Sequence, residues 1–306
     1  MSSAVLSAPE FHDEAAAFAH VEARVWPQGP VCPHCGCVER IGKLGGKSTR
    51  MGVYKCYECR KPFTVRVGTI FEDSHVALRL WLQAMFLVAS SKKGISANQL
   101  HRTLGVTLKT AWFMGHRIRE AMKVQATQKL GSAGTSGIVE TDETYFGKTR
   151  GHGKGAHLSK KQKVVAMLER GGAVRSFHVR RVTSKNLKPI LDSQIAESAR
   201  LMTDAAGLYE KIGKGFASHE TVNHAIGEYA RGDVTTNTVE GYFGILKRGM
   251  TGVYQHCNED HLHRYLAEFD FRYTKRVALK VNDTMRASAL VANVSGKRLT
   301  YRELTT

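Results

Sequence analysis

The chain has 306 residues, of which 42% are hydrophobic and 24% charged, so its composition is that of a folded protein with room for two or three compact units. Its 45 basic residues outnumber the 27 acidic ones and give a formal net charge of +18. This charge favours a polyanionic partner, nucleic acid first, over a protein that merely stays soluble through charge. No apolar window reaches the roughly 18 residues of a membrane span, and the acidic N-terminus lacks a secretory signal pattern. We therefore expect a cytoplasmic protein without a membrane partner.

A cysteine-bearing β module is predicted over residues 26–72, after a short N-terminal helix within residues 1–25. The segments "CPHCG" and "CYECR" give the spacing C-x2-C-x20-C-x2-C. Each pair places two thiolates on a tight turn, and two such turns can enclose Zn²⁺ in a tetrahedron. Cys37 can replace Cys35 as a ligand, but the spacing favours Cys35. We predict a zinc ribbon with one structural zinc ion, held by Cys32, Cys35, Cys56 and Cys59.

The ribbon offers a basic loop from Lys43 to Lys55, which can meet DNA phosphates. A helical section follows over residues 73–129. Two helices across a turn containing Gly105 are typical of a helix-turn-helix, although an αα-hairpin without a role in DNA binding is the alternative interpretation. Beside a zinc module and a basic composition, we predict DNA contacts by the second helix, through Lys109, Arg117 and Arg119.

Three acids stand out in the part of the chain that follows a predicted linker, "LGSAGTSG", at residues 130–137. Asp142 lies in the strand signal "IVETDETYFG", and Asp204 ends the apolar strand "ARLMTD". Glu240 lies near the start of a helix after "GDVTTNT", with 35 residues between it and Asp204. Strands alternate with helices over residues 138–276, and the polar residues 277–306 are expected to form an extended or helical arm.

Two strand-borne aspartates and a helix-borne glutamate can meet as a ring of hard oxygen ligands, which suits two Mg²⁺ (or Mn²⁺) ions. Taken singly, each acid has an ordinary structural interpretation as a turn cap, a helix N-cap or a partner of the helix dipole. Their order, their element types and the basic surroundings favour the metal site. Asn237, three residues before Glu240 on the same helix face, is a candidate for an assisting role.

Basic residues next to these acids are candidates for holding the DNA backbone, although a charge run is often only solvated. The segment from Lys148 to Lys163 holds six Lys or Arg residues and no acid, and a basic turn lies about two helical turns beyond Glu240. We expect phosphate contacts from Lys148, Arg150, Lys154, Lys160, Lys161, Lys247 and Arg248.

The chain resembles bacterial insertion-sequence transposases of the DDE type that carry an N-terminal zinc ribbon. The matching segments include "CPHCG", "VETDETYFGK", "TDAAGLY", and, most specifically, "HETVNHAIGEYARGDVTTNTVEGYFGILKRGMTGVYQH" and "HLHRYLAEFDFRYTKR", and they cover most of residues 30–276. The resemblance implies an RNase H-like catalytic domain, with a mixed central sheet flanked by helices. It also implies that the catalytic acids are Asp142, Asp204 and Glu240.

In some of these relatives an asparagine belongs to the catalytic motif, which leaves the metal contact open between Asn237 and Glu240. A carboxylate binds Mg²⁺ better than an amide does, which favours Glu240. The chain departs from the family at Thr235, where relatives often have a histidine. Either His219 or His224 takes its place, or these are ordinary loop histidines.

The resemblance implies a bacterial, nucleoid-associated transposase that cleaves and joins DNA at the ends of its own insertion sequence. Its partners would be double-stranded DNA, both element ends and target, and further copies of itself on that DNA. The alternatives are an RNase H-like nuclease without joining activity and a non-catalytic zinc-ribbon regulator. The intact acids argue against the regulator, and the two predicted DNA-binding modules favour the transposase over the nuclease.

Overall fold

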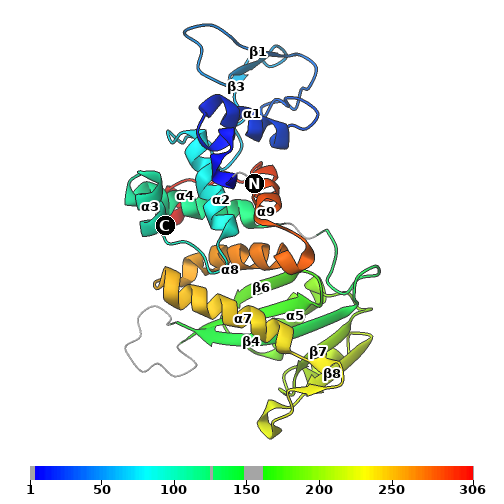
Figure 1. Ribbon diagram of the computed structural model, residues 1–306. Helices are drawn as coiled ribbons and strands as arrows, with labels where there is room; N and C mark the ends of the chain where they lie inside the picture. The colour runs from blue at the N-terminus through cyan, green and yellow to red at the C-terminus, as the bar shows by residue number, and fades with distance from the viewer. Residues whose placement is uncertain (1–3, 125–126, 148–160, 306) are drawn as a thin grey trace. The chain divides into compact units, whose positions relative to one another are not determined.

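The computed structural model describes residues 4–124, 127–147 and 161–305, which form two compact units. The first unit combines Met1–Ser91, Ile95–Met122 and Asn282–Thr306, and the second combines Lys92–Gly94 and Lys123–Val281. The chain therefore leaves the first unit, builds the second and returns to the first (Figure 1).

A small antiparallel sheet and a helix begin the first unit. The strands β1 (Ile41–Lys43), β2 (Tyr54–Cys56) and β3 (Pro62–Phe63) pair in sequence order. The Trp26 ring packs edge-on against the rings of Tyr54 and Phe63, with centroids 5.6 and 5.8 Å away, and these three rings form a small core beside the cysteines. Two 3-10 turns, η1 (Val5–Ser7) and η2 (Pro9–Phe11), precede the helix α1 (Glu14–Val25).

Helices account for most of the remaining described part of the first unit. The apolar run "WLQAMFLVAS" lies in α2, where Leu78, Trp81 and Met85 are almost completely enclosed. This matches the buried helix expected from the run. The helices are α2 (Leu78–Ser90), α3 (Ala97–Leu104), α4 (Leu108–Met122), α9 (Asp283–Ala292) and α10 (Arg302–Thr305).

The two helices α3 and α4 lie across the short turn that the sequence predicts. The Ser96 hydroxyl caps α3 by accepting a hydrogen bond from the Gln99 amide at 3.1 Å. Gly105 ends α3 with a φ of +67°, a conformation that glycine adopts without strain. The Thr107 hydroxyl then accepts from the Thr110 amide at 3.1 Å, at the start of α4. Local capping therefore sets both ends of the turn.

The C-terminal residues are integrated into the first unit, rather than forming a separate arm. The helix α9 packs against α2 and α1, and the buried Arg286 donates through Nη1 to the carbonyl of Ala89 at 3.1 Å. Just after α9, the carbonyl of Val294 accepts from the Ile70 amide at 3.3 Å. Residues of this C-terminal segment thus supply part of the packing of the first unit.

A five-stranded mixed sheet forms the centre of the second unit, in the order β6-β5-β4-β7-β8. The first three strands of this order pair antiparallel, and β4, β7 and β8 pair parallel. Around it lie short elements: β9 (Ala230–Arg231), β10 (Val234–Thr235), η4 (His224–Ile226), η5 (Met250–Tyr254) and η6 (Val277–Leu279). The sheet strands are β4 (Ile138–Phe146), β5 (Gln162–Glu169), β6 (Val174–Val179), β7 (Arg200–Asp204) and β8 (Ser218–Val222).

Helices cover both faces of this sheet. The helices α7 (Asn237–Gly249) and α8 (Glu259–Thr274) pack against one face, and α5 (Ser184–Gln194) and the short α6 (Glu210–Gly213) pack against the other (Figure 1). Asp142 pairs with Ala166, which belongs to the core under α7 and α8, whereas Glu143 pairs with Val165, which belongs to the core under α5. Adjacent acids of β4 therefore point to opposite faces. A mixed sheet between two helical layers confirms the predicted RNase H-like fold class.

The predicted linker differs from the structure. Leu130 is buried, forms a bridge with Ile195, and belongs to the core under α5. The next residue, Gly131, donates its amide to Glu169 Oε1 at 3.0 Å. The glycines and serines of this segment suggested a free connection, but its leading leucine docks it onto the second unit. Among the described helices, none is long and apolar enough to cross a membrane.

Candidate active site and zinc centre

The three candidate acids come from three elements of the second unit. In the parallel pair of β4 and β7, Glu140 is opposite Met202. Two residues further along each strand, this register sets Asp142 level with Asp204, at the carboxyl end of β7. Glu240 lies in the first turn of α7, which packs on the face of the sheet to which Asp142 points. The fold therefore brings the three predicted acids toward one edge of the sheet.

The electrostatics of Asp142 show that these acids influence one another. The pKa of Asp142 is raised to about 7, mainly by burial and in addition by the negative charges of Glu143, Asp204 and Glu240. A backbone hydrogen bond from the Glu143 amide, 2.7 Å from Asp142 Oδ1, works in the opposite direction. Several carboxylates gathered in a partly buried place repel one another, and a cation removes that repulsion.

Glu140, two residues before Asp142, fixes the start of α7 to the sheet. Its carboxylate is completely buried and lies 2.6 Å from Arg170 Nε. It also accepts hydrogen bonds from the amides of Thr238 and Val239, at 2.8 and 3.0 Å, and from the Thr238 hydroxyl at 2.9 Å. Amides of the first helical turn have no acceptor within the helix, and here Glu140 accepts from two of them. A strand carboxylate therefore caps the helix that carries Glu240. We did not predict this residue.

Glu143, on the other face of β4, makes a second connection that the sequence did not reveal. Its Oε2 accepts a hydrogen bond from the hydroxyl of the buried Tyr209 at 2.7 Å. Tyr209 follows Asp204 in the turn after β7, and Asp204 contributes to the raised pKa of Glu143, of which burial is the main cause. The Glu143–Tyr209 hydrogen bond therefore joins the strand of Asp142 to the turn that follows Asp204. The only signal in the sequence was that a second acid, Glu143, directly follows Asp142 in "TDET".

His224 lies beside Glu240, whereas His219 does not contact it. His224 Nε2 is 3.4 Å from Glu240 Oε1, and the Thr236 hydroxyl donates to the same oxygen at 3.1 Å. His219 Nε2 instead lies 2.9 Å from the Thr203 hydroxyl, and burial lowers its pKa. Of the two histidines considered in place of the one missing at position 235, His224 is the one next to the candidate acid. Asn237 is exposed at the first position of α7.

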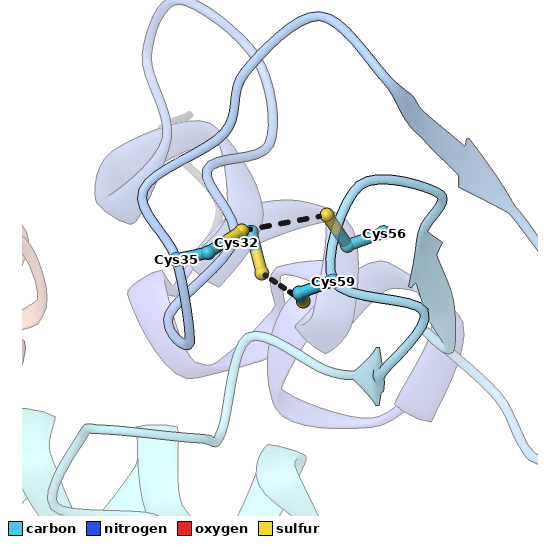
Figure 2. Close-up of side chains that lie close together, drawn as sticks. All are labelled: Cys32, Cys35, Cys56 and Cys59. Carbon is cyan, nitrogen blue, oxygen red and sulfur yellow. Dashed lines mark hydrogen bonds between the residues drawn. The ribbon is translucent and has the colours of Figure 1, made fainter.

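The cysteine centre of the first unit has the geometry of a zinc site. The four predicted ligands converge from two turns, as Figure 2 shows, and their sulfur atoms all lie within 4.8 Å of one another. Sγ of Cys32 lies 3.6 Å from Sγ of Cys59, and Sγ of Cys35 lies 3.6 Å from Sγ of Cys56. Zn–S bonds of about 2.3 Å in a tetrahedron place two sulfurs about 3.8 Å apart. The donor set and its spacing therefore fit one structural zinc ion.

Both cysteine turns share one backbone feature. The residue after the second cysteine of each pair has a positive φ, +76° at Gly36 and +63° at Arg60. Backbone amides of Cys59 and Glu58 donate to the Cys56 sulfur and lower the pKa of that thiol to about 6. Cys37 packs against the ribbon core and is outside the four-sulfur group, as the x2 spacing predicts. Within the described residues, these four cysteines are the one such compact group; the three acids stand further apart.

The comparisons with known proteins agree with the zinc ribbon and with the fold of the second unit. Residues 134–274 match the family described as "ISXO2-like transposase domain", and residues 12–62 match the "Transposase zinc-ribbon domain". These two segments therefore have the domains of an insertion-sequence transposase, a zinc ribbon and a DDE-type transposase domain. A curated relative, the "Uncharacterized protein in transposable element ISH50" of Halobacterium salinarum, is 28% identical over 264 residues, which cover 81% of this chain and 86% of the relative. Transposases are enzymes that cleave and join DNA, so the family implies DNA binding.

Two of the three DNA contacts predicted for α4 need a correction. Arg117 and Arg119 are buried within the first unit. Arg117 donates to the backbone carbonyls of Leu299 and Ile70, both at 2.9 Å, so its charge serves the fold and is not presented to DNA. Lys109, in the exposed first turn of α4, lies 4.5 Å from the centre of the Tyr301 ring and remains on the surface.

The basic residues predicted near the transposase site are described only in part. Lys247 and Arg248 are exposed in the last turn of α7, about two turns beyond Glu240 on the same helix. Lys161 is half-buried just before β5. Lys148, Arg150, Lys154 and Lys160 lie outside the described residues.

Proposed function

We propose that this transposase cleaves DNA at the ends of its own insertion sequence and joins the freed 3′-OH to target DNA, with Asp142, Asp204 and Glu240 as the metal-binding catalytic acids. The observation that carries the proposal is the gathering of these acids, from two strands and a helix, into mutual electrostatic reach. Their carboxylates are hard oxygen ligands that fit two Mg²⁺ or Mn²⁺ ions.

The bound ions would activate the attacking water or hydroxyl and stabilise charge during in-line displacement at phosphorus. The residues of the chain hold this arrangement. Glu140 fixes α7 and hence Glu240, while the Glu143–Tyr209 pair connects the strand of Asp142 to the turn after Asp204. His224 and Thr236 hold Glu240 Oε1 from the protein side, which leaves its other oxygen for a metal ion. Asn237 is proposed as an assisting group, because its exposed side chain is one turn before Glu240.

Lys247 and Arg248 are proposed to hold phosphates next to the scissile bond, because both extend into solvent along the helix of Glu240. In the first unit we propose backbone contacts from Lys109 and from the basic loop of the ribbon, where Lys47 and Arg50 are exposed. Two element ends must be held together before joining, so we further propose that the protein acts as a homo-oligomer on DNA.

A strand-transfer assay with labelled element ends, a target plasmid and Mg²⁺ tests the function. We expect cleaved and joined products from the native protein, and a loss of both in Asp142→Asn, Asp204→Asn and Glu240→Gln. Glu197→Gln is the matched control, because Glu197 is an exposed acid of the same unit that lies away from the three candidate acids in the sequence. Its products should equal those of the native protein.

The assay also separates the alternative functions. Cleavage without joining by the native protein would favour a nuclease, and DNA binding with neither step would favour a regulator. Full activity in any of the three acid variants would refute the assignment of that acid. If Asn237→Ala abolishes activity while Glu240→Gln retains it, the metal contact belongs to the asparagine.

A further inference from the structure

A group of basic side chains lies where strand β6 ends and helix α5 begins, outside the site described above. Arg180 and Arg181 follow β6, and Lys185 is in the first turn of α5; all three are exposed. On the neighbouring strand β5, Lys163 pairs in register with Val179 at the end of β6. Lys161 directly precedes β5. We call Lys161, Lys163, Arg180, Arg181 and Lys185 the β6–α5 basic surface.

Two residues of this surface, Lys163 and Arg180, lie close enough to His178 to affect its pKa. The pKa of His178 is lowered, mainly by burial, and the positive charges of both Lys163 and Arg180 lower it further. Glu259 and Asp260, at the start of α8, are the acids that act on the same histidine. Two acids against five basic residues leave the surface positively charged.

Most arginines of the second unit are used inside the protein, which distinguishes them from this surface. Arg170 pairs with Glu140, Arg200 with Glu220, and Arg272 with Glu268. In the part of the chain that the structure describes, neither Arg180 nor Arg181 forms an ion pair or a side-chain hydrogen bond, and the same is true of Lys185. Exposed cations of like sign that lack internal partners repel one another, and an external polyanion relieves that repulsion.

The surface lies beyond the carboxyl end of β6, and β6 runs in the same direction as the two strands that carry Asp142 and Asp204. Asp142 is level with Ala166 of β5 and Ser176 of β6, and Arg180 follows Ser176 by four residues. Two strand spacings and four strand residues correspond to a separation of roughly 16 Å. That is about half a turn of B-DNA, so one duplex can reach the acids and this surface together.

We propose that the β6–α5 basic surface binds the DNA phosphodiester backbone beside the active site, without reading sequence. The proposal rests on the proposed function, because it places DNA at the three acids. Contacts of this kind are made by charge alone, so they should act on any duplex and should weaken as salt displaces them.

The test is equilibrium binding of the full-length, zinc-loaded protein to fluorescent duplexes, without added Mg²⁺, from 50 to 300 mM salt. One duplex carries the element end and another of equal length has an unrelated sequence. The variant Arg180→Gln/Arg181→Gln/Lys185→Gln removes three charges from exposed positions. Each lost phosphate contact should reduce the slope of log K against log salt by about 0.9, so the triple variant should lose up to about 2.7. Between 50 and 200 mM salt, the native protein should then lose roughly 40-fold more affinity than the variant.

Lys188→Gln is the matched control, because Lys188 is on the same helix but its Nζ lies 2.7 Å from Asp192 Oδ2. It should leave the slope unchanged, and circular dichroism should show that all variants are folded. An unchanged slope in the triple variant would overturn the proposal, as would a change limited to the element-end duplex. Because the readout is binding without Mg²⁺, a reduced slope supports this surface even if the strand-transfer assay fails, and the two proposals can be judged separately.

Discussion

The buried carboxylate of Glu140 should determine how firmly α7 is attached to the sheet. It has no exposed surface, and it receives four hydrogen bonds, from Arg170 Nε, the Thr238 hydroxyl and the amides of Thr238 and Val239. In Glu140→Ala, all four donors lose this acceptor, although Arg170 keeps the carbonyls of Asp233 and Thr235. Breaking a buried ion pair by removing one partner costs about 3–5 kcal/mol.

For a unit of this size, such a loss corresponds to a fall in melting temperature of roughly 10 °C. The isosteric variant Glu140→Gln keeps one acceptor oxygen but places an NH₂ group against donors, and we expect it to lose about 2 kcal/mol, the contribution of one hydrogen bond to a charged group. Urea and thermal unfolding, followed by circular dichroism, measure both losses. The same variants should need more Mg²⁺ for half-maximal cleavage, because Glu240 is one turn from the loosened helix start.

The control for this prediction is Glu220→Gln. Glu220 also pairs with an arginine, Arg200, at 2.6 Å, but its side chain is 31% exposed, and exposed ion pairs contribute at most about 1 kcal/mol. If Glu140→Gln destabilises the protein no more than Glu220→Gln does, the carboxylate does not cap α7 in the way we describe.

Three further predictions concern the zinc centre and the proposed catalytic metal site. Cys32→Ser and Cys56→Ser should each abolish the zinc content measured by atomic emission, whereas Cys37→Ser should retain it; equal zinc in all three would show that the ligands are wrongly assigned. Burial raises the pKa of Asp142 in the folded state. The Mg²⁺-free protein therefore loses stability as pH rises from the pKa of this carboxyl in the unfolded chain toward about 7. Without added Mg²⁺, Asp142→Asn should therefore raise the melting temperature, by an amount that grows from pH 5 to pH 7 and then levels off; a constant difference would contradict the cause. Tyr209→Phe removes only the hydroxyl that holds Glu143, and it should raise the Mg²⁺ needed for half-maximal cleavage about tenfold while the DNA affinity stays the same. An unchanged Mg²⁺ requirement would show that this hydrogen bond does not position the aspartates.

The candidate metal ligands could be predicted from the sequence because their signals are local. Two cysteine pairs define a zinc site by spacing alone, and the structure has all four sulfurs together. Asp142 and Asp204 each occupy a recognisable place on a strand, and their level register follows from the parallel pairing of β4 and β7. Local pattern and family resemblance together therefore sufficed for the positions of the acids, whose catalytic roles remain predictions.

The supporting residues could not be predicted, because their partners are distant in the sequence. In "VETDE", the acids Glu140, Asp142 and Glu143 look alike, and only the fold shows that one meets α7 and another meets Tyr209. The prediction for Arg117 was wrong for the same reason. Its charge suggested a DNA contact, but its guanidinium donates to carbonyls of residues 70 and 299, which are distant in the sequence. Net charge describes the whole chain and does not distinguish an arginine that faces solvent from one that is buried.

The return of the chain to the first unit has a consequence for truncated chains. The helix α9 packs on α2 and α1, so part of the apolar surface of α2 stays uncovered in a chain that lacks Asn282–Thr306. Such a chain still contains all of the second unit, which ends at Val281. A stop codon directly after Val281 would therefore leave a second unit that can fold, joined to a first unit that exposes part of its core and tends to aggregate.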